Sequence, residues 1–287
     1  MNHSSKAVAA AYSHCLQIAR GHYENFPVAS ILVPKRMRRP IVAIYAFARS
    51  ADDFADEGEL APDIRLSQLD AYATKLDRIA ANQRDDDPIF IALADAIKQH
   101  ELPMQLFYDL LTAFRMDVTT TRYANWDEVL RYCRYSANPI GRLLLHLYKE
   151  TTPQQLVWSD AICSALQVIN FLQDIEQDYT ENKRIYLPMD EMAQFGIDES
   201  HFANTLSDAA MRRFINFQID RAAALLRSGL PLAQALSGRL GIELRLTAQG
   251  GLAVLEALKR QDTSVFARPR LRHRDWLGII WRATLRR

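Results

Sequence analysis

The stretch PIVAIYAFARSADDFADEG, residues 40–58, decides the fold, because it begins apolar, ends acidic and keeps one helical repeat throughout. Its polar side chains recur at spacings of three and four, which places them on one face of an α-helix. They are Tyr45, Arg49, Asp52, Asp53 and Asp56. Aspartates near a helix C-terminus oppose the helix dipole, so this face needs a compensating charge such as a bound cation. The alternative is a solvated acidic helix end in which Arg49 forms a local ion pair.

A second stretch, LQVINFLQDIEQD at residues 166–178, has the same design. Its polar residues follow the helical spacing i, i+3, i+7, i+11 and are Gln167, Asn170, Asp174 and Asp178. Because apolar residues flank this stripe, we expect the helix to lie in the interior, where a polar stripe without partners would be costly. A metal or ligand is then the natural partner. The alternative is a polar seam that is hydrogen-bonded to a neighbouring helix.

The two acidic stretches together indicate a metal-dependent reaction of a diphosphate. Carboxylate oxygens suit Mg²⁺, which usually combines one or two carboxylates with substrate phosphates. We expect the two faces to line one helical cavity, where Mg²⁺ ions take up a diphosphate leaving group and stabilise its departing charge. Departure leaves a carbocation, so the rest of the cavity should be apolar and dry.

The rest of the 287-residue chain also shows helix-period patterns, and its strand signals are weak. We expect helices at roughly 7–20, 35–58, 63–82, 87–99, 103–116, 126–149, 153–181, 207–227, 231–260 and 273–284. No linker rich in glycine, serine or proline separates two halves, and no internal repeat stands out. The sequence therefore predicts one all-α domain spanning residues 1–287.

Bulk properties exclude several other classes of protein. Lysine plus arginine (35) nearly balance aspartate plus glutamate (34), which argues against a nucleic-acid partner. The ten glycines form no glycine-rich phosphate loop, and the three cysteines are scattered without metal or redox spacing, as in a reducing compartment. The N-terminus lacks the apolar core of a secretory signal, and no apolar run is long enough to span a bilayer. We therefore expect a cytoplasmic protein.

The C-terminal segment, residues 268–287, contains seven arginines together with Trp276 and Trp281. A basic amphipathic helix with tryptophans suits an anionic membrane surface, so peripheral contact with the inner face of the membrane is one interpretation. The other is that the tryptophans dock this last helix onto the helical bundle.

Over nearly its whole length the chain resembles the squalene/phytoene synthase family. The two acidic stretches carry the resemblance, together with Tyr132-Cys-Arg-Tyr135, the small residues that follow up to Gly141, and Arg184-Ile-Tyr186-Leu-Pro188. The resemblance implies an isoprenoid-synthase helical bundle around a central apolar cavity. It also implies Mg²⁺ as cofactor and an isoprenoid diphosphate as substrate.

The resemblance assigns roles to individual residues. The implied metal ligands are Asp52, Asp53, Asp56, Asp174 and Asp178. The implied diphosphate-binding residues are Arg49, Gln167, Lys183, Arg184 and Tyr186, the last three forming a short basic flap. The implied catalytic residues are Tyr45, Tyr132, Asn138 and Asn170. The tyrosine ring faces would stabilise carbocations. The alternatives are core packing for the tyrosines and surface salt bridges for the flap.

Within the family the likeness is greatest to a bacterial branch that ionises presqualene diphosphate and lets water capture the rearranged cation. Condensing members usually carry His-Ser-x-Ser-Phe where this chain has His22-Tyr-Glu-Asn-Phe26, so serines for a second diphosphate are missing. They also carry an arginine where this chain has Gln173. Both departures favour a reaction of one diphosphate.

A third departure lies in the stretch Ser136-Ala-Asn138-Pro139-Ile-Gly141, where the family usually has a small apolar kink. Ser136 and Asn138 put polar groups beside an expected apolar cavity. Our hypothesis is that they help to position the water that quenches the cation. The alternative is that Asn138-Pro139 only shapes a helix kink.

Two other functions compete with this reading. One is a condensing synthase that joins two farnesyl diphosphates to presqualene diphosphate, squalene or a phytoene-like product. The other is a non-catalytic lipid-binding or assembly factor. Such a factor should have lost its acidic ligands, whereas this chain keeps both acidic stretches.

Overall fold

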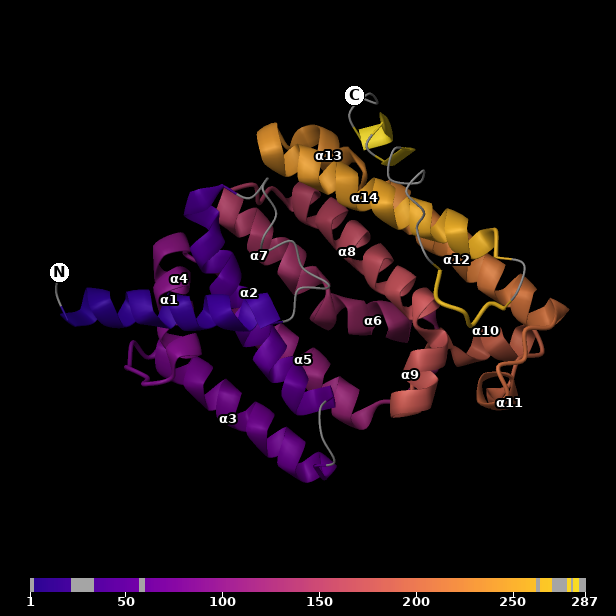
Figure 1. Cartoon of the computed structure of the whole chain (residues 1–287), viewed down its shortest axis with the longest axis horizontal. Helices are drawn as coiled ribbons and strands as arrows, with labels where there is room; N and C mark the ends of the chain where they lie inside the picture. The colour runs from indigo at the N-terminus through magenta and orange to yellow at the C-terminus, as the bar shows by residue number, and fades with distance from the viewer. Residues whose placement is uncertain are drawn as a thin grey trace. The chain divides into compact units, whose positions relative to one another are not determined.

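The computed structural model describes residues 3–21, 34–56, 60–261, 264–269, 278–279 and 281–283. Apart from two short strands, the regular structure of these residues is helical, which confirms the all-α prediction (Figure 1). By contacts the chain divides into two compact units. The N-terminal unit comprises Met1–Thr119 and Pro139–Thr151, and the C-terminal unit comprises Thr120–Asn138 and Thr152–Arg287. A single domain over the whole chain stays a prediction.

The N-terminal unit is built around the helix that carries the first acidic stretch. Its helices are α1 (His3–Gly21), α2 (Lys35–Asp56), α3 (Pro62–Ala80), α4 (Pro88–His100), α5 (Met104–Thr119) and most of α7 (Asn138–Tyr148). Phe47 of α2 is fully buried and meets Phe90 of α4 and Phe107 of α5 edge to face, at ring centroid distances of 5.9 and 5.5 Å. Such aromatic pairs add to the stability that area burial provides. The apolar face of α2 is thereby fixed in the core.

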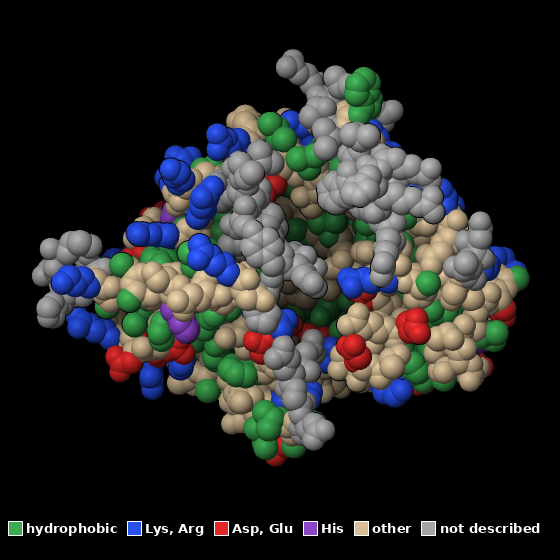
Figure 2. Space-filling model, viewed as in Figure 1, with side chains coloured by type: hydrophobic (Ala, Val, Ile, Leu, Met, Phe, Trp, Pro, Cys, Tyr) green, Lys and Arg blue, Asp and Glu red, His purple; other side chains and the backbone are tan. Residues whose placement is uncertain are grey.

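The charges along α2 run against the dipole of the helix. Its first turns carry the exposed basic residues Lys35, Arg36, Arg38 and Arg39, and Figure 2 shows Lys and Arg side chains gathered over this end of α2. Cations at the N-terminus and aspartates at the C-terminus are both unfavourable in an isolated helix. The stability of helix α2 therefore depends on the packing of its buried apolar face.

The C-terminal unit contains the remaining elements. They are β1 (Arg122–Tyr123), α6 (Trp126–Ser136), α8 (Pro153–Gln173), α9 (Ile175–Asn182), β2 (Ile185–Pro188), α10 (Met189–Gln194), α11 (Glu199–Ala203), α12 (Ala209–Gly229), α13 (Pro231–Ala235) and α14 (Gly238–Lys259). Helix α8 packs against α12 and α14, which lie beside it in Figure 1. The approach of α12 is close, because a Cβ added at Gly229 would lie 2.6 Å from the carbonyl oxygen of Trp158.

The strands β1 and β2 pair in parallel, and the amide of Ile185 donates to the carbonyl of Thr121 at 3.0 Å. This pairing attaches the chain after α9 to the chain before α6. The sequence does not predict it, because strands of two and four residues are too short to show a period.

The expected helices that the structure interrupts are 126–149, 153–181 and 231–260. The first breaks between α6 and α7, where Pro139 lacks an amide donor and disfavours helical geometry at the residue before it. The third breaks between α13 and α14, where Gly238 has a φ of +65°, a conformation that glycine adopts readily. The second breaks at Asp174 (φ −111°, ψ 20°), although Asp174 and Asp178 keep their i to i−4 backbone hydrogen bonds.

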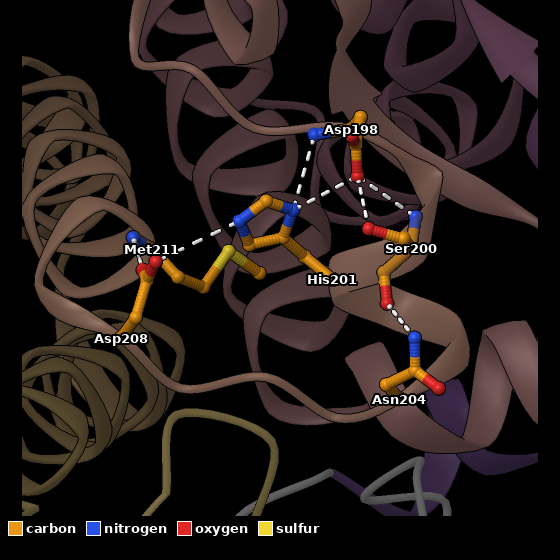
Figure 3. A network of polar contacts seen from close by, with 6 residues as sticks. All are labelled: Asp198, Ser200, His201, Asn204, Asp208 and Met211. Atoms are coloured by element: carbon orange, nitrogen blue, oxygen red, sulfur yellow. Dashed lines mark hydrogen bonds and ion pairs between the residues drawn. The ribbon is translucent and has the colours of Figure 1, made fainter.

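The starts of α11 and α12 are joined through one histidine (Figure 3). Asp198 caps α11 by accepting from the Ser200 amide, and Asp208 caps α12 by accepting from the Met211 amide. The ring of His201 lies between the caps, with Nδ1 3.0 Å from Asp198 Oδ1 and Nε2 3.8 Å from Asp208 Oδ2. The Ser200 hydroxyl donates to the Asp198 carboxylate, and this hydrogen bond, followed by the contact with His201, holds the pKa of Asp198 below its usual range.

Two sequence predictions fall wholly or partly outside the described residues. The stretch His22–Phe26 is not among them, and of the expected last helix only 278–279 and 281–283 are described, as helix. In the described part of the chain, no helix is both long enough and apolar enough to cross a membrane.

Candidate active site

The first acidic stretch forms a compact ion cluster on α2. One guanidinium nitrogen of Arg49 lies 3.0 Å from Asp52 Oδ2 and the other lies 2.7 Å from Asp53 Oδ1. All three side chains are about one-third exposed or less. Asp56 is the last residue of the helix, and its side chain is outside the described part. The arginine therefore balances two carboxylates that remain accessible, as the local ion-pair reading also expects.

The structure of α2 explains why these carboxylates share a face. Ala51 and Ala55 are fully buried on the core side, so Asp52 and Asp53 lie on the side away from the core. At the end of the helix, Arg65 of α3 donates to the carbonyl of Ala55 at 3.1 Å. A cation at a helix C-terminus complements the dipole. Sequence spacing gives no signal for Arg65, which belongs to a different helix.

Tyr45 lies one turn before Arg49 on the same helix and is partly exposed. Burial raises the pKa of its hydroxyl, Arg49 lowers it, and Asp52 and Asp53 raise it further. Because the ordinary tyrosine pKa of about 10 already lies above physiological pH, an upward shift leaves Tyr45 neutral there. The structure thus places Tyr45, Arg49 and the two aspartates together, as the sequence predicts.

The polar stripe of the second acidic stretch lies on an accessible side of α8 and of the start of α9. Asn170 is exposed, and Gln167, Asp174 and Asp178 are partly exposed. Among the described residues, no hydrogen bond uses the side chain of Gln167 or Asn170. The flanking Val168, Ile169, Phe171 and Leu172 are buried instead. These apolar residues fill the helix interfaces, so the polar stripe is left on the accessible side. For Gln167 and Asn170, the described residues therefore show no seam against a neighbouring helix.

Asp174 is paired with an arginine far along the chain. Arg268 Nε lies 2.9 Å from Asp174 Oδ1, and Arg268 Nη2 lies 3.4 Å from Oδ2. Burial raises the pKa of Asp174, and the Arg268 guanidinium acts in the opposite direction. The sequence does not reveal this pair, because no spacing rule connects residues that are 94 positions apart.

An aromatic cluster surrounds the predicted tyrosine of α6. Tyr132 is buried, and its ring centroid lies 5.3 Å from Tyr186 and 5.7 Å from Tyr123. Tyr186 in turn stacks on Phe171 of α8 at 3.9 Å. The sequence predicts Tyr132 and Tyr186 but not Tyr123, since the β1–β2 pairing that brings Tyr123 into the cluster leaves no periodic signal. The cluster gives Tyr132 a packing role in addition to the predicted catalytic one.

The predicted basic flap divides into an exposed and a buried part. Lys183 is exposed in a left-handed conformation (φ 53°), with its ammonium 4.7 Å from the centroid of the Tyr179 ring. Arg184 is buried, and its guanidinium donates to the Tyr186 hydroxyl at 3.3 Å. Arg184 and Tyr186 therefore hold the segment in place from within the unit.

The junction between α6 and α7 places polar groups inside the unit. Asn138 is buried, and its Oδ1 accepts a hydrogen bond from the Ser164 hydroxyl of α8 at 2.9 Å. The Ser136 hydroxyl oxygen is also buried and has no hydrogen-bond partner among the described residues. A buried hydroxyl without a partner is costly, so this position favours a small polar ligand such as water. The stretch therefore contains both a helix break and the two polar side chains of Ser136 and Asn138. It is compatible with a helix kink and with the positioning of water.

The two acidic stretches have the oxygen donors that suit Mg²⁺, and each already attracts a cation in the form of Arg49 or Arg268. In the described ranges, no group of three or more His, Cys, Asp or Glu side chains is close enough together to hold a metal alone. Mg²⁺ with few protein ligands usually completes its shell with water and phosphate. The donor set therefore fits a metal that binds together with a diphosphate.

Comparison with known proteins gives one consistent result. The family model described as "Squalene/phytoene synthase" matches residues 19–276. The chain is 38% identical to a hydroxysqualene synthase of Rhodopseudomonas palustris, over 83% of this chain and 80% of that protein. It is 36% identical to a hydroxysqualene synthase of Zymomonas mobilis, over 85% and 82%. The crystal structure of squalene synthase HpnC from Alicyclobacillus acidocaldarius is similar with a TM-score of 0.83 at 37% identity, covering 88% of this chain and 95% of that one.

Proposed function

Because this chain belongs to the squalene/phytoene synthase family, we propose that it converts presqualene diphosphate and water to hydroxysqualene and diphosphate in a Mg²⁺-dependent reaction. The observation that carries the proposal is the pair of acidic stretches, each balanced by an arginine, in a chain 38% identical to a hydroxysqualene synthase. In the reaction the carbon–oxygen bond to the diphosphate breaks, the cation rearranges, and water forms a new carbon–oxygen bond and releases a proton.

The acidic residues serve the first step in this proposal. Asp52, Asp53, Asp56, Asp174 and Asp178 hold Mg²⁺, which neutralises the charge that develops on the diphosphate as it leaves. Their partial exposure, where it is described, leaves them open to a substrate. The two stretches belong to different units, and their joint action on one diphosphate is part of the proposal.

The groups around the acidic residues bind and orient the diphosphate. Arg49 and Lys183 reach it from accessible positions, while the buried Arg184 and Tyr186 fix the segment that carries Lys183. Gln167 and Asn170 contribute donors from the open side of α8. Charge-assisted hydrogen bonds of this kind are about twice as strong as neutral ones.

The aromatic and amide groups serve the cation. Tyr45 and Tyr132 present ring faces, which attract a cation by about 2 kcal/mol or more when water is excluded. Asn138 and Ser136 hold the water that ends the reaction. The orphaned Ser136 hydroxyl supports this role, because a bound water would satisfy it.

The C-terminal segment supports a peripheral membrane contact as a further part of the proposal. Ile279 and Ala283 are buried, while the Trp281 ring between them is 68% exposed. Such an arrangement docks one side of the segment and presents a tryptophan outward, which suits the interface where a C30 substrate resides.

Substrate preference separates this function from that of a condensing synthase. Purified protein with Mg²⁺ is incubated with presqualene diphosphate or with farnesyl diphosphate, with and without reduced nicotinamide, and the products are identified by mass spectrometry. We expect hydroxysqualene from presqualene diphosphate alone, without a nicotinamide requirement, and loss of the product when EDTA removes the metal. Turnover of farnesyl diphosphate alone would show a condensing synthase, and no turnover of either would favour a binding factor.

A further inference from the structure

The pair Arg268–Asp174 occupies a carboxylate that the proposed reaction needs for metal. Both oxygens of Asp174 face the guanidinium, at 2.9 and 3.4 Å. The Asp174 side chain is 23% exposed and the Arg268 side chain 61% exposed, so solvent reaches the pair from the arginine side. An ion pair with this exposure is weak and can exchange.

Arg268 belongs to a short segment whose inner part is firmly attached. In residues 264–269, Val265 and Phe266 are buried, and the Val265 amide donates to the Ser207 hydroxyl at 3.1 Å. The Phe266 ring meets Phe202 of α11 edge to face at 6.1 Å. Figure 1 shows the segment as a yellow coil beside α12. The outer part has a different attachment. Ala267 and Arg268 are exposed, the Ala267 carbonyl accepts from the Gln261 side-chain amide at 2.8 Å, and the pair with Asp174 holds Arg268.

A divalent cation and a guanidinium that face the same carboxylate oxygens compete for them. Mg²⁺ coordinates a carboxylate oxygen at about 2.0–2.1 Å, which would bring it against the guanidinium that now faces both oxygens. The two cations also repel each other, and a divalent ion gains more from the carboxylate than a monovalent one. Binding of one cation therefore weakens the binding of the other.

We propose that Arg268 is an internal counter-ion of Asp174 which Mg²⁺ displaces, so that metal binding at the second acidic stretch releases the outer end of the segment 264–269. The inference rests on the proposed function in one respect, the assignment of Asp174 as a metal ligand. In the metal-free protein the arginine pairs with Asp174 and holds the segment beside it. In the metal-bound protein the segment remains attached through Val265, through Phe266 and through the hydrogen bond that the Gln261 side-chain amide donates to the Ala267 carbonyl.

Mg²⁺ binding without substrate tests the competition. Isothermal titration with MgCl₂ compares the wild type with Arg268→Gln and with the control Arg282→Gln, which removes an arginine that pairs with Glu256 on α14 instead. We expect Arg268→Gln to bind Mg²⁺ roughly two- to fivefold more tightly, the range for loss of a competing exposed ion pair. The control should bind as the wild type does. Equal affinities in all three proteins, or no Mg²⁺ binding by the wild type, would overturn the proposal.

A spin label tests the release. The nitroxide is attached at Ala267→Cys, an exposed position, after Cys163 is changed to Ser, because the other two cysteines are buried. We expect Mg²⁺ to increase the mobility of the label in the wild-type background, and Arg268→Gln to show the mobile spectrum without Mg²⁺. Should Arg268→Gln fold poorly, Asp174→Asn removes the other partner and should give the same mobile spectrum. A label whose spectrum ignores both Mg²⁺ and these substitutions contradicts the release.

The two proposals fail separately. If the protein forms hydroxysqualene but neither the label nor the Mg²⁺ affinity responds, the proposed function is supported and the counter-ion proposal is rejected. A responsive label in a protein that forms no hydroxysqualene leaves the counter-ion standing and removes the function.

Discussion

Asn138 combines a structural contact with a proposed chemical role in one side chain. Its oxygen accepts from the Ser164 hydroxyl at 2.9 Å, which ties the start of α7 to α8. Beside it in the sequence, the buried Ser136 hydroxyl has no hydrogen-bond partner among the described residues. If Asn138 has only a structural role, its hydrogen bond to Ser164 accounts for the residue. If Asn138 positions water, its side-chain amide must also contact that water.

Paired substitutions separate the two roles. Asn138→Ala and Ser164→Ala each delete the same hydrogen bond, so each should lower the free energy of unfolding by about 1 kcal/mol. Only Asn138→Ala should also lower the yield of hydroxysqualene, by about tenfold, because a positioning hydrogen bond of about 1.4 kcal/mol corresponds to that factor. Denaturant unfolding and product analysis measure the two effects. Equal product loss in both variants would return Asn138 to a structural role.

At the residue scale, sequence spacing predicted contacts between residues of the same helix, and it did not predict contacts between different elements. The i+3 and i+4 rule brought Arg49 to Asp52 and Asp53, and the structure shows both contacts. Arg268 and Tyr123 reach the site region through contacts distant in sequence, which no period encodes. The sequence therefore gave the acidic residues of the candidate site and missed the partners that come from other elements.

At the scale of elements, the contact between α12 and α8 depends on a glycine. A Cβ at Gly229 would lie 2.5 Å from Ile162 Cγ1 and 2.6 Å from the Trp158 carbonyl oxygen, which belongs to the α8 backbone and cannot turn away. Gly250 of α14 is the matched control, because a Cβ there meets nothing within 4 Å. The same Gly→Ala change thus tests packing at one position and helix propensity at the other.

We expect opposite effects on the free energy of unfolding. Gly229→Ala should lower it by about 1–3 kcal/mol, the usual cost of overpacking. Gly250→Ala should raise it by about 0.5–1 kcal/mol, because alanine loses less conformational entropy in a helix. Urea unfolding followed by circular dichroism measures both. A stable Gly229→Ala protein would mean that α12 and α8 are further apart than described.

The caps of α11 and α12 give stability a pH dependence. The pKa of Asp198 is lowered by the hydrogen bond from Ser200 and by the contact with His201 (Figure 3). A carboxyl group whose pKa is lower in the folded state stabilises the folded state at pH values above its pKa in the unfolded state, which is about 4. This contribution is lost as the pH falls through the pKa of the folded state. Asp198→Asn keeps a good cap but removes the charge. The wild type should exceed this variant in stability at pH 6, and the difference should shrink at pH 3. A difference that is constant with pH would contradict the role of the charge.

Helix periodicity located the long elements and missed their interruptions. The expected helix at 35–58 corresponds to α2, and that at 103–116 corresponds to α5. The breaks at Asp174 and at Gly238 lie within apolar patterns that continue past them, so the period alone does not show them. The short helices α10 and α11 have five or six residues, less than two turns, and give no periodic signal.

At the scale of the whole molecule, the family was predicted from motifs in the sequence, and the comparisons confirm it. Helical content follows from periodicity, but the division into two compact units does not, because no linker composition marks residues 120 or 152. The chain passes between the units three times, and the third motif stretch, around Asn138, lies at one of these passages. Sequence patterns describe segments one by one, whereas units arise from contacts between segments.

The central claim concerns the source of one oxygen atom. In the proposed reaction the carbon–oxygen bond of presqualene diphosphate breaks and solvent water attacks carbon. The most direct measurement is therefore incubation of the purified protein with Mg²⁺ and presqualene diphosphate in H₂¹⁸O, followed by mass spectrometry of the product. We predict hydroxysqualene that carries one ¹⁸O atom. An unlabelled alcohol, which would require cleavage between phosphorus and oxygen, or a hydrocarbon without oxygen, would contradict the account.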